Sequence, residues 1–599
     1  MAPQLPPELV LACLQQLDPA DIQTIPTLVA AAQVSTSFAA LAKAAVLWRP
    51  VADAQYHQHR PPSDRAAFEA DAFAYTASRR RKDLRARSLV RELQRPYNRL
   101  ELVDKLRQLG SDVIENRLWA PSEFSEDKRP QSWLSLRHWA NEARRTLLRD
   151  EAIELWRAIA ERDARGEEAD DDFERGLDAF AAFRGIDPTL LPRERYDVYR
   201  HHQELVEATK TLPFQGAQQL EYLANEVHEH MKRLRLGPAL DGTFHNLDNH
   251  YVEIVWSRAE LHREGENEGT LPMTLVAIFC SLVRRLPIAR ELGIRARPIG
   301  FPGTVLAGLA FDGSSEWTYC NVFKGTTIVR PAALREMLAA VGQPALPEFL
   351  EPASAKAMCL RVARNILTSI RSGDQSIGVP IGHSVATSAL YSVAHALFVF
   401  SSPPSSGGAP QPFERGVQDQ YAGWLRSLVQ SEFPLDVSHL ERAVAPALSG
   451  ALARETRDLC AAIRADDQGP REQKLVSARI RWRIGHVFEH RLFEYRAVIR
   501  GWDYRCEASE EWIQQMRVDS LPFGRAQPFY HVLVLNDGSS RYVAHENVTD
   551  FAFADEDAVV ERALKIDGIG KWFRRRERAE NGRWVFVPSE EVEAEYPDS

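Results

Sequence analysis

Helical periodicity dominates the first part of the chain. Near its start, "LPPELVLACLQQLDP" places Leu9, Cys13, Leu14 and Leu17 at helical spacing, with prolines before the run and Asp-Pro after it. A second apolar helix is predicted near residues 27–44. Short helices within about fifty residues bury little apolar surface by themselves. The apolar residues of this module therefore either bind a partner or pack on the rest of the chain, and the pattern leaves both alternatives open.

The next hundred residues keep the helical spacing and carry a basic run, "RRRKDLRARSLVRELQR", at 79–95. We interpret this run as a helix with a solvated basic face and with Leu84 and Leu89 pointing inward, in preference to a nucleic-acid contact. The acidic stretch "ERDARGEEADDDFERG" at 161–176 is predicted to be a surface loop.

In the middle of the chain, helices are followed by strands. Helical spacing is found at 216–234 and 271–293, and again at 331–341 and 355–373. Strands are predicted between these two pairs of helices, at 295–301, 304–311 and 316–323. The run "SSPPSSGGAPQP" at 401–412 is predicted to be a flexible break, and helical sequence follows it to about residue 475.

From residue 480 the apolar positions alternate, which is typical of strands. The alternation is found in "RIGHVFEHRLFEYRAVIRGWD" and in "PFYHVLVLNDGSSRYVAHENVTDF", where the latter contains the turn sequence Asn536-Asp537-Gly538. A further hairpin is predicted at 572–588, with Asn581-Gly582 as a type I′ turn. These residues predict a small β-barrel with an appended hairpin.

Composition and charge place the chain among ordinary water-soluble proteins. Its 599 residues suggest about four domains. The net charge of −9 and a pI near 6.1 argue against general affinity for nucleic acid or acidic membranes. The first residues, "MAPQLPPELV", show no basic leader and no long apolar core, so no secretory signal is expected. The apolar run "TLVAIFCSLV" is too short to cross a bilayer.

Cysteine and histidine spacing does not favour a metal site or a disulfide framework. No two of the six cysteines have the spacing of a C-x-x-C pair, which is consistent with a protein of a reducing compartment. His486 and His490 lie in strand-like sequence, and the side chains of His228 and His230 point apart on a helix. We therefore expect no metal, no cofactor and no membrane partner, and a cytoplasmic or nuclear location.

The first fifty residues contain a series of short motifs. They are Leu5-Pro6, Glu8-Leu9, Leu17-Asp18-Pro19, Val34-Ser35 and Leu47-Trp48. The segment resembles the F-box family, whose members insert their helices against the Skp adaptor of cullin-based ubiquitin ligases. The resemblance implies the following adaptor-binding residues: Leu5, Pro6, Leu9, Leu14, Leu17, Val34, Leu47 and Trp48.

The middle region carries "LPMTL", "LVRRLPIARELGIRARPIGFPG", "YCNVF" and "CLRVARNIL". It resembles the SirB-type transglutaminase-like fold, whose wider superfamily uses a nucleophile at a helix start, then a His and an acid on successive strands. Here those positions fall on Thr274, Thr304 and Asn321. Thr cannot act as a base near neutral pH, and Asn carries no charge to steady an imidazolium. We expect a catalytically degenerate site. Cys280, six residues further along the same helix, is predicted to lie in the core.

The C-terminal sequence resembles the YccV or HspQ domain, described in its family as binding hemimethylated DNA. The following residues carry the signature: Gly485, His490, Gly501, Trp502, Asp503, Trp512, Gln527, Pro528, Phe529, Tyr530, Glu546 and Asn547. From Arg481 to Asp550 there are nine arginines and no lysine against ten acidic residues. A duplex-binding domain normally presents a basic face. We therefore favour a protein-binding or structural barrel, in which Trp502 and Tyr530 are either core aromatics or a recognition surface.

These resemblances together predict a multidomain α+β protein. The expected segments are an F-box, a helical region, a transglutaminase-like domain, a helical connector, a β-barrel and a terminal hairpin. Their bounds are 1–55, 56–165, 166–375, 376–478, 479–575 and 576–599. The order resembles a group of F-box proteins that recruit a protein substrate to a Skp–cullin ligase without being enzymes themselves. Two alternatives remain: a DNA-binding scaffold through the barrel, and a cysteine-dependent hydrolase or transferase that uses Cys280.

Overall fold

The structure is a computed structural model of the whole chain. It describes the following residues: 6–21, 23–56, 62–110, 113, 130–185, 198–239, 244–261, 269–324, 328–344, 346–376, 383–401, 412–549 and 555–597. The chain folds into two compact units. The first consists of Met1–Arg144 and Ala462–Ser599, and the second of Arg145–Ala461. Helices and small antiparallel sheets occur in both units, which confirms the multidomain α+β class.

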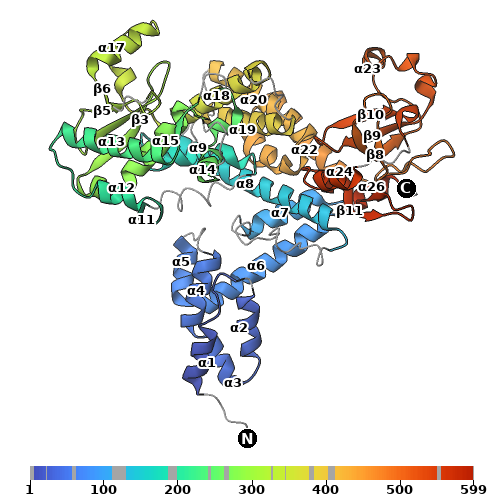
Figure 1. Ribbon diagram of the computed structural model, residues 1–599, viewed down its shortest axis with the longest axis horizontal. Helices are drawn as coiled ribbons and strands as arrows, with labels where there is room; N and C mark the ends of the chain where they lie inside the picture. The colour runs from blue at the N-terminus through green and yellow to red at the C-terminus, as the bar shows by residue number, and fades with distance from the viewer. Residues whose placement is uncertain are drawn as a thin grey trace. The chain divides into compact units, whose positions relative to one another are not determined.

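Four short helices form the N-terminal module of the first unit (Figure 1). They are α1 (Pro7–Leu14), α2 (Thr24–Ala32), α3 (Thr36–Ala42) and α4 (Ala45–Tyr56). The prediction of a single helix near residues 27–44 is therefore wrong, because two helices, α2 and α3, cover this range. Ser35 accepts a hydrogen bond from the Phe38 amide at 3.2 Å and so starts a new helix, which places Val34 in the turn before it.

Two further helices complete the core of this module. They are α5 (Pro62–Ala70) and α6 (Ala72–Glu92), and α6 supplies Tyr75 to the apolar cluster around Trp48. The inward orientation predicted for Leu84 is wrong, because this side chain is 51% exposed, whereas Leu89 is buried. The buried stripe of α6 instead runs through Arg79 and Asp83 at helical spacing.

Helix α7 (Arg99–Leu109) begins at a carboxylate from a distant part of the same unit. The Arg99 and Leu100 amides donate to the Asp467 carboxylate at 3.1 and 3.0 Å. An acidic group there satisfies N–H groups that have no partner inside the helix and faces the positive end of the helix dipole. The Arg99 guanidinium also pairs with Glu591 at 2.8 Å. These contacts link the helical region to the C-terminal segment of the unit.

The C-terminal part of the first unit is built on one antiparallel sheet. Its strands are β7 (Val487–Glu489), β8 (Arg496–Asp503), β9 (Phe529–Val534) and β10 (Ser540–Ala544), in the order β10-β9-β8-β7. A bridge between His490 and Val548 joins the two outer edges, as expected for a small barrel. Short helices flank the sheet: α23 (Glu510–Gln515), α24 (Glu556–Ala563), α25 (Ile569–Trp572) and α26 (Glu590–Glu595).

The predicted terminal hairpin is present as β11 (Phe573–Arg578) and β12 (Trp584–Pro588). Strand β11 begins before residue 576, and Val585 on β12 forms a bridge with His486 just before β7, so the hairpin belongs to the barrel fold. The prediction of a type I′ turn in this hairpin is wrong. Gly582 has a φ of 78°, but Asn581 is not among the residues with positive φ, and type I′ needs both.

In the second unit, helices cover a four-stranded antiparallel sheet. The strand order is β3 (Ile294–Ile299), β4 (Leu306–Phe311), β5 (Thr318–Cys320) and β6 (Ile328–Val329). Helices α13 (Ala217–Arg233) and α15 (Pro272–Arg285) pack on it. The helix predicted over 271–293 ends at Arg285, because the extended Leu286 precedes Pro287, which starts α16 (Pro287–Glu291). Strand β6 was not anticipated.

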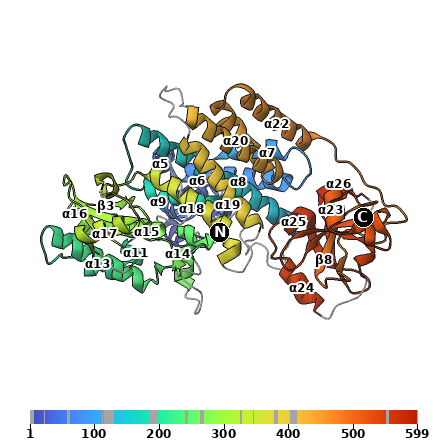
Figure 2. The same ribbon diagram turned by 90° about the horizontal axis from the view of Figure 1, so that it is seen from above.

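A layer of longer helices completes the second unit. Helices α18 (Ala355–Ser376), α19 (His383–Ser401) and α20 (Pro412–Ser431) lie side by side in both views (Figures 1 and 2), and α9 (Asp172–Ala182) packs against α18. The remaining elements with more than two residues include α8 (Trp133–Ala164), α11 (Val198–His201), α12 (Gln203–Ala208), α14 (Val252–Leu261), α17 (Pro331–Ala340), α21 (Val437–His439) and α22 (Gly450–Gln468). Most of the predicted break at 401–412 lies outside the described residues.

Helix α19 is the one described helix that is long and apolar enough to cross a membrane. Its window Ser384–Ser401 is 61% buried inside the protein. A core helix packed between α18 and α20 has this same composition, so the window carries no argument for a membrane span.

Candidate functional site

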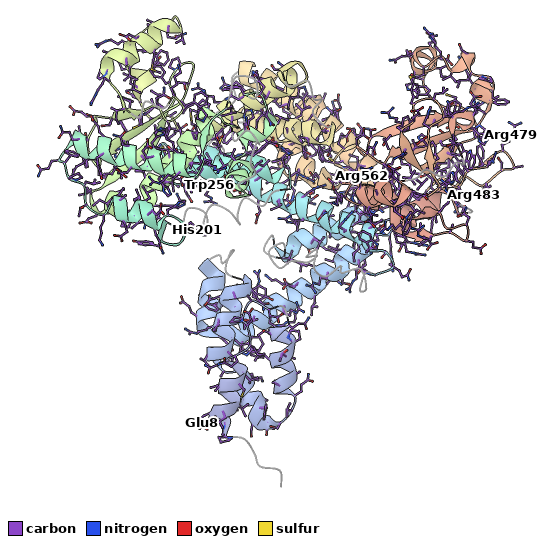
Figure 3. The ribbon with its side chains drawn as sticks, in the orientation of Figure 1. Glu8, His201, Trp256, Arg479, Arg483 and Arg562 are labelled. Carbon is purple, nitrogen blue, oxygen red and sulfur yellow. The ribbon has the colours of Figure 1, made fainter. Side chains whose placement is uncertain are left out.

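The N-terminal helical module exposes part of its apolar surface. Leu9 on α1 is 53% exposed, and Val34, between α2 and α3, is 67% exposed. Pro6 and Glu8 are also exposed, and Figure 3 labels Glu8 at the end of the module where α1 begins. Large apolar side chains that stay exposed together within one small module indicate a surface for a partner.

The other predicted adaptor-binding residues lie deeper. Leu14 and Leu17 are half-buried, while Leu47 and Trp48 lie in the core. The Trp48 indole N–H donates to the Ala42 carbonyl oxygen, which fixes α4 against the end of α3. Leu5 lies outside the described residues. The structure thus divides the motif into a core that packs on α6 and an outer face around Leu9 and Val34.

In the second unit, Thr274 lies in the first turn of α15, where a nucleophile of the transglutaminase superfamily is expected. Its side chain is buried, and its hydroxyl donates to the Asn249 carbonyl oxygen at 3.1 Å. The hydroxyl therefore has a backbone partner. It ties the helix start to the preceding 3-10 turn, Leu247–His250.

The other two expected positions, Thr304 and Asn321, lie at one end of the sheet. Thr304 precedes β4 and Asn321 follows β5, and the antiparallel pairing of Ala307 with Cys320 brings these two strand ends together. The Asn321 side-chain oxygen accepts from the Lys324 amide at 3.1 Å and shapes the turn after β5. Neither side chain ionises near neutral pH.

The start of α15 lies toward the same end of the sheet. The chain leaves the C-terminus of α15 and enters β3 through α16, and Arg284 near that C-terminus donates to the Ala296 carbonyl oxygen at 2.8 Å. Helix and strand are therefore antiparallel and of similar length, so Thr274 lies toward the end of β3 that leads to Thr304. The three positions share one end of the sheet, but they carry two hydroxyls and one amide.

A second polar cluster lies at the 3-10 turn that contacts Thr274, and the motif did not reveal it. The Ser369 hydroxyl on α18 is 3.0 Å from His250 Nε2 and 3.2 Å from His245 Nδ1. Both histidines precede the nucleophile position and lie on no strand, so the superfamily pattern does not single them out. One feature of the sequence could have indicated Ser369: it is a polar residue on the buried, otherwise mostly apolar stripe of α18.

This cluster favours a structural role. Burial, followed by the charge of His245, lowers the pKa of His250 to about 3, so its imidazole stays neutral near pH 7. Ser369 has one hydroxyl hydrogen, which it can donate to one ring while it accepts from the other. The Ser369 side chain is almost fully buried, which leaves no approach for a substrate carbonyl. The hydroxyl therefore joins α18 to the 3-10 turn.

Cys280 does not have the properties of a catalytic cysteine. It is fully buried in the middle of α15, and burial raises the pKa of its thiol to about 12. A reactive cysteine needs a lowered pKa and an accessible sulfur. Its position agrees with the prediction that Cys280 is a core residue.

The barrel signature residues mainly build the fold. Trp502 and Tyr530 are fully buried and belong to the barrel core, so they are not a recognition surface. His490 is buried, and its Nδ1 accepts from the Leu492 and Phe493 amides at 3.2 Å each. Burial lowers the pKa of His490 to about 4. The ring thus caps a turn as a neutral acceptor.

Amide hydrogen bonds and aromatic packing involve most of the other signature residues. The Gln527 side-chain oxygen accepts from the Glu546 amide at 3.1 Å, next to the buried Pro528 and Phe529. The Asn547 carbonyl oxygen accepts from the Arg491 amide, and Trp512 packs beside Tyr542. These contacts account for the signature as a set of turns and packing positions.

Asp503 anchors the most polar group of the barrel. Its carboxylate accepts from Lys474 at 2.6 Å, from His531 at 3.0 Å and from Tyr542 at 2.6 Å. Burial by itself raises the pKa of Asp503, but these hydrogen bonds outweigh it and hold the pKa well below its usual range. The group is fully hydrogen-bonded and fastens the segment before the barrel to β8.

Comparison with known families matches three parts of the chain. Residues 2–52 match the F-box-like model, residues 207–364 match a transglutaminase-like superfamily model, and residues 480–580 match the model described as hemimethylated DNA-binding protein YccV like. These matches confirm the three resemblances read from the sequence. The chain therefore combines an F-box-like module, a transglutaminase-like domain and a YccV-like domain.

Among curated proteins, the chain is similar to "F-box only protein 21" of Mus musculus, with 39% identity over 115 residues. The proteins of the same name from Pongo abelii and Homo sapiens are 38% identical over 115 residues. Each match covers 19% of this chain and 16% of the relative, so the chain spans about a sixth of the length of the curated relatives it matches. No solved structure gives a significant match to the chain.

Proposed function

We propose that the chain is the substrate-recognition subunit of a Skp–cullin–F-box ubiquitin ligase. The F-box-like module docks a Skp adaptor, which is bound in turn to a cullin. The observation that carries this proposal is the exposed apolar face around Leu9 and Val34, within the segment that matches the F-box-like model. A Skp-type adaptor would cover this face, and burying it would contribute to the binding free energy.

The transglutaminase-like domain and the barrel then act in target binding and not in catalysis. Thr274, Thr304 and Asn321 supply no base and no acid, and Cys280 supplies no accessible thiolate. The six cysteines are free, as suits a protein of the cytoplasm or the nucleus. The target in this account is a protein that the ligase modifies.

Co-purification of the tagged full chain with a Skp adaptor and a cullin tests the docking face. Leu9→Asp places a charge in the exposed apolar face, and we expect it to remove both partners from the purified complex. Leu84→Asp is the matched control, because Leu84 is equally exposed at 51% in the same unit but lies outside the F-box-like segment. Trp48→Ala is unsuitable, since Trp48 lies in the core and its loss changes folding.

The proposal fails if the wild-type chain brings down no adaptor, or if Leu84→Asp removes the adaptor as completely as Leu9→Asp. Retention of the adaptor by Leu9→Asp would place the docking surface elsewhere and contradict the face proposed here.

Duplex DNA binding by the barrel is a second candidate, favoured by one surface feature. Arg479, Arg481 and Arg483 alternate with buried residues and are all exposed, and Figure 3 labels Arg479 and Arg483 on the barrel. A shift of a hemimethylated duplex that weakens steeply with salt would support it. We expect no shift at physiological ionic strength, because the nine arginines of residues 481–550 are offset by ten acidic residues.

A further inference from the structure

A cavity of about 870 Å³ opens in the second unit beside the edge strand β3. Its walls come from β3, the C-terminal end of α15, α16 and the residues just before α9. It lies at the opposite end of α15 from Thr274, so it is separate from the degenerate transglutaminase positions. A cavity of this volume is large enough to hold several amino-acid residues of a ligand.

Five arginines line this cavity, which we call the arginine cavity: Arg284, Arg285, Arg290, Arg295 and Arg297. Each of the five contacts an acidic group or a carbonyl oxygen. Arg284 pairs with the buried Glu174, and Arg297 pairs with Glu168. Arg295 donates to the Ser314 carbonyl oxygen at 2.6 Å and lies over the Trp317 ring, 5.1 Å from its centroid.

This anchoring orients the guanidinium groups before any ligand arrives. Each guanidinium has five N–H donors in a fixed plane, and the contacts above use only some of them. Arg290 is exposed, and its Nε donates to the Arg284 carbonyl oxygen at 3.3 Å. Its terminal nitrogens have no partner within the part of the chain that the structure describes. Preorganised donors lower the entropic cost of binding an anion.

The rest of the lining favours a peptide over a polyphosphate. Asp170, Asp171 and Asp312 also line the cavity, and they would repel a continuous row of phosphates. A peptide can place its carboxylates against the arginines and its amide N–H groups against the aspartates. Trp317 and Pro352 supply apolar surface for the peptide backbone and side chains.

We propose that the arginine cavity binds an acidic segment of the protein target. This inference rests on the proposed function and names the chemistry of the segment that the ligase recognises: consecutive or closely spaced Glu and Asp side chains. The net charge of the chain is negative, and acidic groups pair with Arg284, Arg285, Arg295 and Arg297. The attraction is therefore local to this cavity and rests most on Arg290.

Fluorescence polarisation with the full-length chain tests the inference. The probe is a fluorescein-labelled tetraglutamate peptide, and the tetraglutamine peptide is the comparison. We expect saturable binding of the acidic probe only, weakened about tenfold by Arg290→Glu, since this change reverses one charge at an exposed position. Arg335→Glu, on the exposed side of α17 in the same unit, is the matched control and leaves binding unchanged.

The inference is overturned if both peptides bind equally, if the acidic probe does not bind, or if Arg335→Glu weakens binding as much as Arg290→Glu. Binding of inorganic polyphosphate in place of the acidic peptide also overturns it.

Adaptor binding is measured on the same preparations, and it depends on the first unit. If the chain binds the adaptor but not the peptide, only the peptide-binding inference is contradicted. If it binds the peptide but not the adaptor, only the proposed ligase role is contradicted.

Discussion

Single residues decide whether the middle domain can be an enzyme. A cysteine mechanism requires a thiolate, and the pKa of Cys280 is raised to about 12 by its burial in α15. Cys320 and Cys359 are buried as well, whereas Cys13 on α1 is exposed. The candidate thiols of the second unit are therefore core residues.

A thiol reagent applied to the native chain measures this directly. We expect Cys13 to be modified fast and Cys280 to be protected until the second unit unfolds, because the reagent needs an accessible thiolate. Peptide mass spectrometry assigns the modified cysteine. Fast modification of Cys280 in the folded protein would revive the hydrolase or transferase alternative.

The histidines give the second residue-scale expectation, which concerns pH. The pKa of His250 is lowered to about 3, so the folded protein keeps this ring neutral while the unfolded chain protonates it below about pH 6.5. As pH falls, the unfolded state gains its proton first, and stability is lost between about pH 6.5 and pH 3. His230, with a pKa lowered to about 4, acts in the same direction.

Replacing His250 isolates its share of this effect. From the two pKa values, the loss of stability at pH 5 relative to neutral pH is about 2 kcal/mol for this one group. We expect His250→Gln to reduce the pH dependence by about that amount, measured as the opening free energy of α18 from hydrogen exchange at pH 7 and pH 5. The exposed His201 is the control: His201→Gln leaves the pH dependence unchanged. An unchanged dependence in His250→Gln would show that the ring is not held neutral.

At the scale of elements, the entry into the barrel depends on one glycine. Gly485 has a φ of 82°, and a Cβ atom there would lie 1.7 Å from the Phe586 carbonyl oxygen. The Gly485 amide donates to Ile499, and its carbonyl oxygen accepts from Phe586. The glycine therefore lets β12 approach β8 from outside the four-stranded sheet.

Two glycine substitutions separate backbone strain from close packing. Gly485→Ala combines a positive φ with a backbone clash, so we expect it to destabilise the barrel by more than about 3 kcal/mol. Gly582→Ala has a similar φ of 78° but nothing within 4 Å, so it should cost only about 1 kcal/mol. Pulse proteolysis in urea measures both. Equal effects would mean that the contact with Phe586 is not tight.

The elements were more predictable from the sequence than the sites. Long amphipathic helices such as α13 and α18 bury one face each, so their spacing reveals them. Strands β8 and β9 are mostly buried, and their apolar residues reveal them as strands. The division of residues 27–44 at Ser35 was missed because a cap residue also fits inside a continuous apolar pattern. Strand β6 was missed because a strand of two residues is too short to show an alternating pattern.

The sites depend on contacts between distant residues, which spacing does not contain. Ser369 meets His245 and His250 across more than a hundred residues of chain. The arginine cavity joins residues before α9 to residues around β3 and Pro352. The motif that marks the F-box was visible in the sequence, but only the structure separates its core, with Trp48, from its exposed face, with Leu9 and Val34.

At the scale of the whole molecule, the two units carry different parts of the proposed function. The first unit contains the F-box-like module and the YccV-like barrel, and the second contains the transglutaminase-like domain and the arginine cavity. In the proposed function, adaptor docking by the F-box-like module and peptide binding in the arginine cavity therefore belong to surfaces that can be changed separately. A charge placed on one surface should leave the other function intact.

The proposed ligase role depends on the binding of a Skp adaptor to the exposed face of the F-box-like module. Isothermal titration of a purified Skp adaptor into the full-length chain measures this binding. We expect saturable binding at one adaptor per chain, weakened at least about tenfold by Val34→Asp and unchanged by Leu84→Asp. Absence of saturable binding to the wild-type chain, or equal weakening by the two variants, would contradict it.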